Sequence, residues 1–268
     1  YFTIHSGQHY SYNLDRVFFE QLELPEPVYN LEVGSGSHAY QTVGVLTGVE
    51  DILKKEKPDV VLVEGDTNTV LAAALAAVKL HIKVGHVEAG LRSYDRSMPE
   101  EINRILTDHA SDYLFAPTDT AKEILLDESI PGERIYVTGN TIVDAVNENL
   151  EIAAKKDASD ALPDIRKGEY FLATLHRQEN VDNPERFASI LEGMGQVAME
   201  FDMPVIYPIH PRARKNMKSF GLGAEGITLI EPVDFIEFLR LESNARLVLT
   251  DSGGVQEEAP ALGKPVLV

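Results

Sequence analysis

Short apolar runs alternate with longer amphipathic stretches along most of the chain, and this alternation constrains the fold more than any other feature. A strand, a helix and a second strand in succession build a parallel sheet covered by helices. In the first half, the predicted strands are residues 59–64, 83–87, 113–115 and 134–137. The helices predicted between and after them are residues 68–80, 99–110, 118–127 and 141–156.

The pattern restarts after a polar stretch, residues 157–168, which we interpret as a linker. Further strands are predicted at residues 170–174, 204–208, 227–230, 246–250 and 265–268, with a helix at 184–200. We therefore expect an α/β protein with two Rossmann-like, doubly wound parallel-sheet domains, residues 1–156 and 157–268, that face a cleft. Ligands of such folds bind beyond the carboxyl ends of the strands.

Composition excludes several classes of protein. The 268 residues include no cysteine, which rules out disulfides and any cysteine-based nucleophile or metal site. A formal charge of −19 argues against a nucleic-acid partner or an anionic membrane surface. Neither a bilayer-length apolar run nor a signal peptide is visible. We expect a cytoplasmic protein.

Two polar clusters follow predicted strands of the first half. Asp66 comes directly after the strand at 59–64, where it either caps the next helix or points a carboxylate into the cleft. Glu88 ends the strand at 83–87, in a cluster that also holds His86 and Arg92. The alternatives are that His86 is a hydrogen-bonded core residue and that Arg92 is solvated.

A third cluster opens the predicted helix at 99–110, where Glu100 lies in the first turn. An acidic residue in this position is favoured by the helix dipole alone, so the cluster is weak by itself. Beside Asp66 and Glu88, however, Glu100 would be a third acidic group on the same rim.

Two more clusters follow strands of the second half. His176 and Arg177 come after the strand at 170–174 and would bring positive charge to the cleft, unless they belong to an ordinary surface loop. The run at 251–258 is more specific, because a strand leads into glycines that open a helix. Exposed N–H groups and the positive helix end there make a phosphate site, and glycine permits close approach. The residues assigned to this site are Ser252, Gly253 and Gly254, with Glu258 one turn later for a ribose and His210 adding positive charge.

These motifs, in this order, resemble the non-hydrolysing UDP-N-acetylglucosamine 2-epimerases, which have the glycosyltransferase-B type of fold. The resemblance covers essentially the whole chain. It rests on residues 7–9, 65–67, 85–92, 99–104, 138–141, 176–180 and 250–268.

The resemblance implies interconversion of UDP-N-acetylglucosamine (UDP-GlcNAc) and UDP-N-acetylmannosamine (UDP-ManNAc). UDP is eliminated to give a 2-acetamidoglucal and is then added back with C2 inverted, in a pathway that supplies cell-surface polysaccharide. It further implies that Asp66, Glu88 and Glu100 act as acid–base groups, that His176 and Arg177 stabilise the leaving diphosphate, and that Phe238 and the Val233 backbone hold the uracil. A homodimer is also implied. The implied reaction needs no redox cofactor, and the sequence shows no evident set of metal ligands.

The family pattern also implies segments that this chain lacks. A first strand with a Gly-Thr-Arg-Pro-Glu motif is expected before Tyr1, and a second Arg-Pro-Glu after Val268, so we expect a chain truncated at both ends. Ser11 and Gly44 stand where bacterial members carry a Gln and an Arg of an allosteric pocket, and the chain is therefore more similar to archaeal members.

Three other functions remain open at this stage. A hydrolysing epimerase that releases free N-acetylmannosamine would share the acidic groups. A glycosyltransferase of the same fold would share only the nucleotide cluster, and a non-catalytic nucleotide-sugar sensor would bind without turnover. A 3-acetamido uronate analogue of the sugar also remains open.

Overall fold

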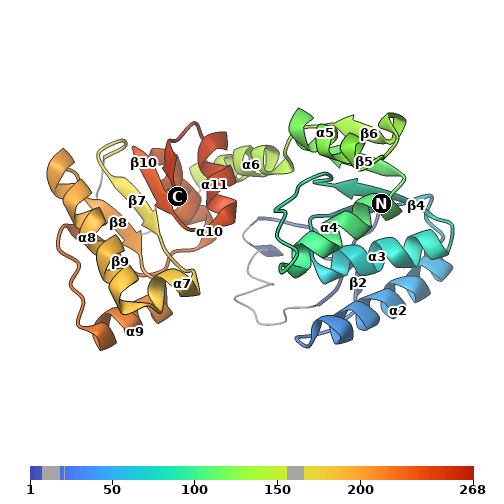
Figure 1. Cartoon of the computed structure of the whole chain (residues 1–268), viewed down its shortest axis with the longest axis horizontal. Helices are drawn as coiled ribbons and strands as arrows, with labels where there is room; N and C mark the ends of the chain where they lie inside the picture. The colour runs from blue at the N-terminus through green and yellow to red at the C-terminus, as the bar shows by residue number, and fades with distance from the viewer. Residues whose placement is uncertain (8–18, 21, 156–165) are drawn as a thin grey trace. The chain divides into compact units, whose positions relative to one another are not determined.

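The computed structural model describes residues 1–7, 19–20, 22–155 and 166–268. The chain divides into two compact units, Tyr1–Thr141 and Ile142–Val268, and each combines parallel strands with covering helices (Figure 1). The domain boundary predicted between residues 156 and 157 lies outside the described residues. No helix in the described part of the chain has the length and apolarity that crossing a bilayer requires.

The first unit is built on a four-stranded parallel sheet in the order β3-β4-β5-β6. All four strands were predicted, as were the helices that follow them, and the structure confirms them. The bounds are β3 (Val60–Glu64), α3 (Asn68–Lys79), β4 (Lys83–Val87), α4 (Pro99–Ala110), β5 (Tyr113–Ala116), α5 (Asp119–Asp127), the 3-10 turn η2 (Gly132–Arg134) and β6 (Ile135–Val137).

Three further elements belong to this unit. Helix α2 (His38–Glu56) packs Val45, Val49 and Leu53 against the alanine-rich face of α3. Small side chains on α3 let the two helices approach closely, and its central alanines are fully buried. Strands β1 (Ile4–His5) and β2 (Tyr29–Asn30) form a separate two-stranded parallel sheet.

The second unit carries a five-stranded parallel sheet in the order β11-β10-β7-β8-β9. Side chains of β7 alternate between two hydrophobic clusters, as successive strand residues must. Phe171 and Ala173 join the cluster that includes α8, whereas Leu172 joins the cluster of α10 and α11. Both faces are thus covered, as a doubly wound sheet requires. The bounds are α6 (Thr141–Lys155), β7 (Phe171–Thr174), α7 (Gln178–Val181), α8 (Pro184–Phe201), β8 (Val205–Pro208), α9 (Pro211–Phe220), β9 (Ile227–Ile230), α10 (Phe235–Asn244), β10 (Leu247–Thr250), α11 (Gly253–Ala261) and β11 (Val266–Leu267).

The strand order of the second unit defines where a ligand can approach. From β7 the chain proceeds outward to β9 and then returns to form β10 on the opposite side of β7. The connections after β7 and β10 therefore diverge at their carboxyl ends, and this switch point leaves a crevice in folds of this type. Two of the polar clusters identified in the sequence lie at this switch point: His176 and Arg177 follow β7, and the run 251–258 follows β10.

Close packing in the first unit depends on Gly90, just beyond β4. This residue has φ +84, and a Cβ there would overlap the carbonyl oxygen of Ala121 and lie 2.9 Å from Cγ of Leu125. Gly139 has φ +86, but nothing lies within 4 Å of its Cβ position.

We expect Gly139→Ala to lower the free energy of unfolding by ~1–2 kcal/mol, the cost of left-handed backbone for an L-residue. Gly90→Ala should cost a further ~1–3 kcal/mol, because the methyl group also overpacks the core. Urea unfolding of both variants measures the difference. Equal losses in the two variants would show that the close approach at Gly90 does not matter.

Candidate active site

The carboxyl ends of β3 and β4 meet the start of α4 at one edge of the first unit. Gly65 donates its N–H to the carbonyl oxygen of Val87 at 3.2 Å, which joins the two strand ends. Asn103 of α4 donates its amide to the carbonyl oxygen of Asp66 at 2.8 Å, and Arg104 forms an ion pair with the Asp66 carboxylate. Asp66 is therefore held by α4 on both its backbone and its side chain.

Glu88 lies at this same edge. Its Oε2 is 3.7 Å from the position that a Cβ on Gly65 would occupy, so its carboxylate lies beside the loop that carries Asp66. Its backbone has φ +68, an uncommon conformation for a residue with a side chain. Strain of this kind concentrates at functional sites.

Glu100 occupies the first turn of α4 and is half-buried. Arg104 lies four residues later, on the same face of the helix, and pairs with Asp66. The structure thus brings Asp66 and Glu88 together and places Glu100 on the helix that contacts Asp66. The catalytic roles of the three residues stay predictions.

A buried network of polar and charged side chains holds the ends of β3 and β4 in place. His86 is fully buried, with Nδ1 2.6 Å from a carboxylate oxygen of Asp108 and Nε2 2.9 Å from the carbonyl oxygen of Gly65. The alternative of a hydrogen-bonded core histidine is therefore correct. Asp108 also accepts the N–H of Gly90 at 3.2 Å.

The suggestion that Arg92 is solvated is wrong. Its side chain is 1% exposed and lies 2.7 Å from Asp108 and 2.6 Å from Glu128. Burial alone would lower the pKa of Arg92, but the two carboxylates outweigh it and raise the pKa. The sequence pattern missed the role of Asp108, because this residue lies inside a helix, about 20 positions along the chain from the end of β4 that it contacts.

The neighbour of Glu100, Glu101, has a structural role. It is 2% exposed and accepts hydrogen bonds from the backbone and hydroxyl of Ser93 and from the backbone of Tyr94. Burial alone would raise the pKa of Glu101, but these donors and the charge of Arg104 hold it below its ordinary value. Glu101 therefore anchors the loop between β4 and α4.

Asp108→Asn should destabilise the protein by ~3–5 kcal/mol, because the buried Arg92 would lose its fully buried carboxylate partner and keep only the partly exposed Glu128. The free energy of unfolding in urea measures the change. Glu50→Gln serves as the control, since the Glu50–Lys54 pair lies on the surface and pairs of this kind contribute little to stability. Losses of similar size in both variants would contradict the importance of the buried network.

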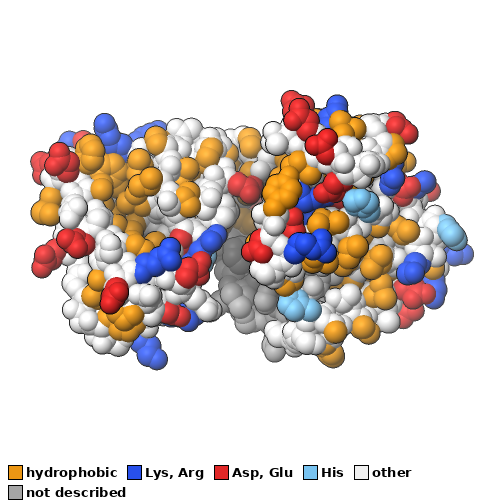
Figure 2. Space-filling view, viewed as in Figure 1, with side chains coloured by type: hydrophobic (Ala, Val, Ile, Leu, Met, Phe, Trp, Pro, Cys, Tyr) orange, Lys and Arg blue, Asp and Glu red, His pale blue; other side chains and the backbone are white. Residues whose placement is uncertain are grey.

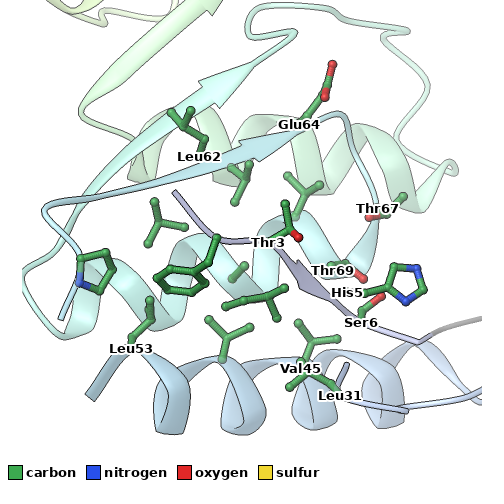
Figure 3. Close-up of a pocket in the computed structure, with 18 of the residues that line it drawn as sticks. Thr3, His5, Ser6, Leu31, Val45, Leu53, Leu62, Glu64, Thr67 and Thr69 are labelled. Atoms are coloured by element: carbon green, nitrogen blue, oxygen red, sulfur yellow. The ribbon is translucent and has the colours of Figure 1, made fainter. Parts of the chain in front are cut away.

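A cavity of about 750 Å³ lies elsewhere in this unit, between β1 and β3 and over α2 and α3 (Figure 3). Its lining is mostly aliphatic, with Leu31, Val45 and Leu53 among the labelled side chains. Asp66, Glu88 and Glu100 are not in its wall. The cavity is large enough for a ligand, but its mostly aliphatic walls provide few groups that could bind a charged nucleotide. We therefore place the candidate site at the edge of the sheet that carries Asp66 and Glu88.

In the second unit, Asp251 joins the two strand ends at the switch point. It is 7% exposed and accepts the backbone N–H of His176 and of Arg177, each at 3.0 Å, and the side-chain amide of Asn180 at 2.8 Å. Nδ1 of His176 lies 2.9 Å from the same carboxylate. The structure therefore brings the two clusters together through Asp251, the first residue of the predicted 251–258 run, to which the sequence analysis assigned no role of its own.

His176 and Arg177 remain about half exposed. Nδ1 of His176 faces Asp251, which fixes the orientation of the ring and leaves the opposite side for a ligand. Arg177 lies 3.7 Å from Glu179, and basic and acidic side chains stand close together over α7 (Figure 2).

The N-terminus of α11 has the predicted features of an anion site. Ser252 is its cap residue, but no side chain caps the helix. Gly253 and Gly254 are exposed, and nothing lies within 4 Å of a Cβ position on Gly253. Uncapped N–H groups at a positive helix end favour an anion. Glu258 reaches back, with Oε1 3.8 Å from the Cβ position of Gly254.

The remaining predicted residues flank this helix end or cap another helix. Val233 and Phe238 pack against the same hydrophobic cluster as Val255 of α11, which places the β9–α10 connection next to α11. His210 caps α9, where its ring accepts the N–H of Arg212. Binding roles for these three residues stay predictions. Of the two departures from the bacterial pattern, Ser11 lies outside the described residues and Gly44 packs against Val33.

The sequence analysis missed Glu242, a fully buried carboxyl group on α10. Burial, and then the negative charge of the nearby Glu258, raise the pKa of Glu242 to about 8. The pKa of Glu258 is also raised, because the side chain is buried. The only sequence signal was a glutamate on the apolar face of an amphipathic helix.

The protein should lose stability as pH rises from about 4.5, the ordinary pKa of a glutamate, to about 8. In this window folded Glu242 keeps a proton that the unfolded chain has released, so the folded state binds more protons. Urea unfolding at a series of pH values measures the slope. Glu242→Gln should flatten it, and an unchanged slope in that variant would assign the effect to other groups.

No group of three or more His, Asp or Glu side chains suited to a metal ion occurs within residues 1–7, 19–20, 22–155 and 166–268. The fold and the site together define a doubly wound α/β protein with a carboxylate-rich edge in one unit and a helix N-terminus at the switch point of the other.

Comparison with known proteins gives the family. The sequence profile of UDP-N-acetylglucosamine 2-epimerases matches residues 1–268. A UDP-N-acetylglucosamine 2-epimerase of Methanocaldococcus jannaschii is 56% identical over 98% of this chain and 74% of its own length. The UDP-2,3-diacetamido-2,3-dideoxy-D-glucuronate 2-epimerase of Pseudomonas aeruginosa is 44% identical over 98% of this chain and 73% of its own.

A crystal structure of the M. jannaschii UDP-GlcNAc 2-epimerase in complex with UDP-GlcNAc and UDP superposes with a TM-score of 0.81 at 56% identity, covering 99% of this chain and 75% of that one. The epimerase from Neisseria meningitidis bound to UDP-GlcNAc gives 0.81 at 39% identity, over 95% and 72%. The chain belongs to the UDP-N-acetylglucosamine 2-epimerase family.

Proposed function

We propose that this protein interconverts UDP-GlcNAc and UDP-ManNAc by eliminating UDP and adding it back. The observation that carries the proposal is the meeting of Asp66 and Glu88 at one strand edge, in a chain 56% identical to an epimerase of that name. The anion site at α11 supports it, because a nucleotide sugar needs a place for its diphosphate.

The chemistry requires carboxylates beside the sugar ring. C2 has no neighbouring carbonyl, so its proton is not acidic in the bound substrate. As the C1–O bond to UDP lengthens, the ring gains oxocarbenium character and the C2 proton becomes acidic. A carboxylate takes this proton, the C2–H electron pair forms the C1=C2 bond of 2-acetamidoglucal, and UDP departs with the C1–O pair.

Return of UDP to C1 and of a proton to the other face of C2 completes the inversion. Two faces require more than one proton-transfer group, and Asp66, Glu88 and Glu100 are the proposed set. Arg104 holds Asp66 in place through their ion pair. The positive helix end of α11, with His176 and Arg177, stabilises the leaving diphosphate, while Phe238 and the Val233 backbone contact the uracil and His210 adds positive charge.

Incubation with UDP-GlcNAc in D2O, followed by NMR, tests the reaction directly. We expect UDP-linked N-acetylmannosamine that carries deuterium at C2, because the proton lost in the elimination is replaced from solvent. The M. jannaschii relative in a parallel sample is the positive control. Free N-acetylmannosamine would instead indicate hydrolysis, and unchanged, undeuterated substrate would contradict an epimerase.

Asp66→Asn and Glu88→Gln should each lower turnover by about 10²–10⁴-fold, the usual contribution of an acid–base group. Both variants should still bind UDP, since neither residue belongs to the nucleotide site. Calorimetry with UDP measures the binding. Loss of UDP affinity in these variants would show that the carboxylates do not have the proposed role.

A second substrate follows from the P. aeruginosa relative, which acts on a UDP-linked 2,3-diacetamido glucuronate and is 44% identical to this chain. The same elimination would operate on that sugar, because its C1 and C2 carry the same groups. Parallel assays with both nucleotide sugars compare the two candidates. We further propose that the product supplies cell-surface polysaccharide and that the protein acts as a homodimer.

A further inference from the structure

Glu242 is the most unusual buried polar residue in the described part of the second unit. It is fully buried on α10, and neither of its carboxylate oxygens has a hydrogen-bond partner among the described residues. Burying a carboxylate without a hydrogen-bond partner costs folding free energy. Its helix neighbours Leu239 and Leu241 are buried as apolar side chains and carry no such cost. Packing alone therefore does not account for a glutamate here.

Glu258 lies on α11, which shares a hydrophobic cluster with α10, and it is the carboxyl group that interacts with Glu242. It is 9% exposed, and the two carboxyl groups interact closely enough for each to change the pKa of the other. Two carboxylates without a proton only repel each other. When Glu242 carries one proton, it donates to Glu258, its own oxygens gain a partner, and Glu258 keeps the single negative charge.

The backbone fixes both members of the pair. Tyr170 donates its hydroxyl to the carbonyl oxygen of Leu241 at 2.5 Å, which ties α10 to the sheet one residue before Glu242. Leu241 packs in one cluster with Val255 of α11. The two helices are therefore held together, and a hydrogen bond from Glu242 limits the directions that the Glu258 side chain can take.

Glu258 points back toward the first turn of α11, with Oε1 3.8 Å from the Cβ position of Gly254. A carboxylate has about four lone-pair sites. With one used by Glu242, the others can accept the two neighbouring hydroxyls of a ribose whose phosphates lie at the helix end.

We propose that Glu242 is a positioning residue, which shares a proton with Glu258 and orients its carboxylate to accept the ribose hydroxyls of the nucleotide. This inference rests on the proposed binding of UDP at α11. It adds a requirement for a neutral Glu242, so that nucleotide affinity falls as pH rises through about 8.

The other ionisable groups near the pair do not produce the same change. Burial raises the pKa of Tyr170, so its hydroxyl stays neutral through this range. Glu257, on α11 itself, adds a negative charge that raises the pKa of Glu258. Arg240 on α10 donates to the carbonyl oxygen of Ala153.

Calorimetric dissociation constants for UDP and 2′-deoxy-UDP between pH 6.5 and 9.5 test the proposal. The native protein should prefer UDP and lose affinity through pH 8. Glu242→Gln keeps a side-chain N–H donor and should bind UDP with native affinity at pH 7 but without the loss near pH 8. Glu242→Met keeps the volume but lacks a donor, and should bind UDP about tenfold more weakly with little preference over 2′-deoxy-UDP.

Ionisation of UDP itself affects all variants alike, so the comparison isolates Glu242. Thermal unfolding of each variant confirms that the fold is intact, and Met in place of a buried acid is not expected to disrupt it. A Met variant with native affinity and native preference for UDP overturns the role of Glu242 and leaves the nucleotide site standing. Failure of the native protein to bind UDP overturns the nucleotide site itself.

Discussion

In each unit, one buried carboxylate gathers several hydrogen-bond donors around the carboxyl end of a strand, β4 in the first unit and β7 in the second. Asp108 holds His86, Arg92 and the N–H of Gly90, and Asp251 holds the backbone of residues 176 and 177 together with Asn180. A charge removed from water needs several donors to offset its desolvation. The loops at the carboxyl edge of each sheet therefore have little freedom, and the exposed groups they carry are positioned in advance.

The two carboxylates that hold the loops differ in character from those proposed to act. Asp108 and Asp251 are almost fully buried, whereas the Asp66 side chain is 27% exposed and Glu88 is half-buried. A group that exchanges protons with a ligand must be reachable, and a group that holds a loop need not be. This distinction separates Glu100 from Glu101 as well, although they are adjacent in the chain.

The sequence alone predicted the strands of both sheets and the position of the polar clusters after them, because apolar periodicity and strand-end position are local properties. It did not predict the state of Arg92, which depends on carboxylates that α4 and α5 bring in from other parts of the chain. Asp108, Asp251 and Glu242 were missed for the same reason. Their roles come from contacts between elements that are distant in sequence, and the identity of one acidic residue does not reveal such contacts.

The left-handed backbone at Glu88 costs stability at a residue for which a catalytic role is proposed. An L-residue in that conformation costs ~1–2 kcal/mol, and glycine would adopt it without strain. A sequence selected for a robust fold alone would place glycine after β4, as it does at Gly90 two residues later. Retaining glutamate there means that the protein operates below the stability its backbone could reach, and that a stabilising Glu88→Gly substitution would remove the carboxylate.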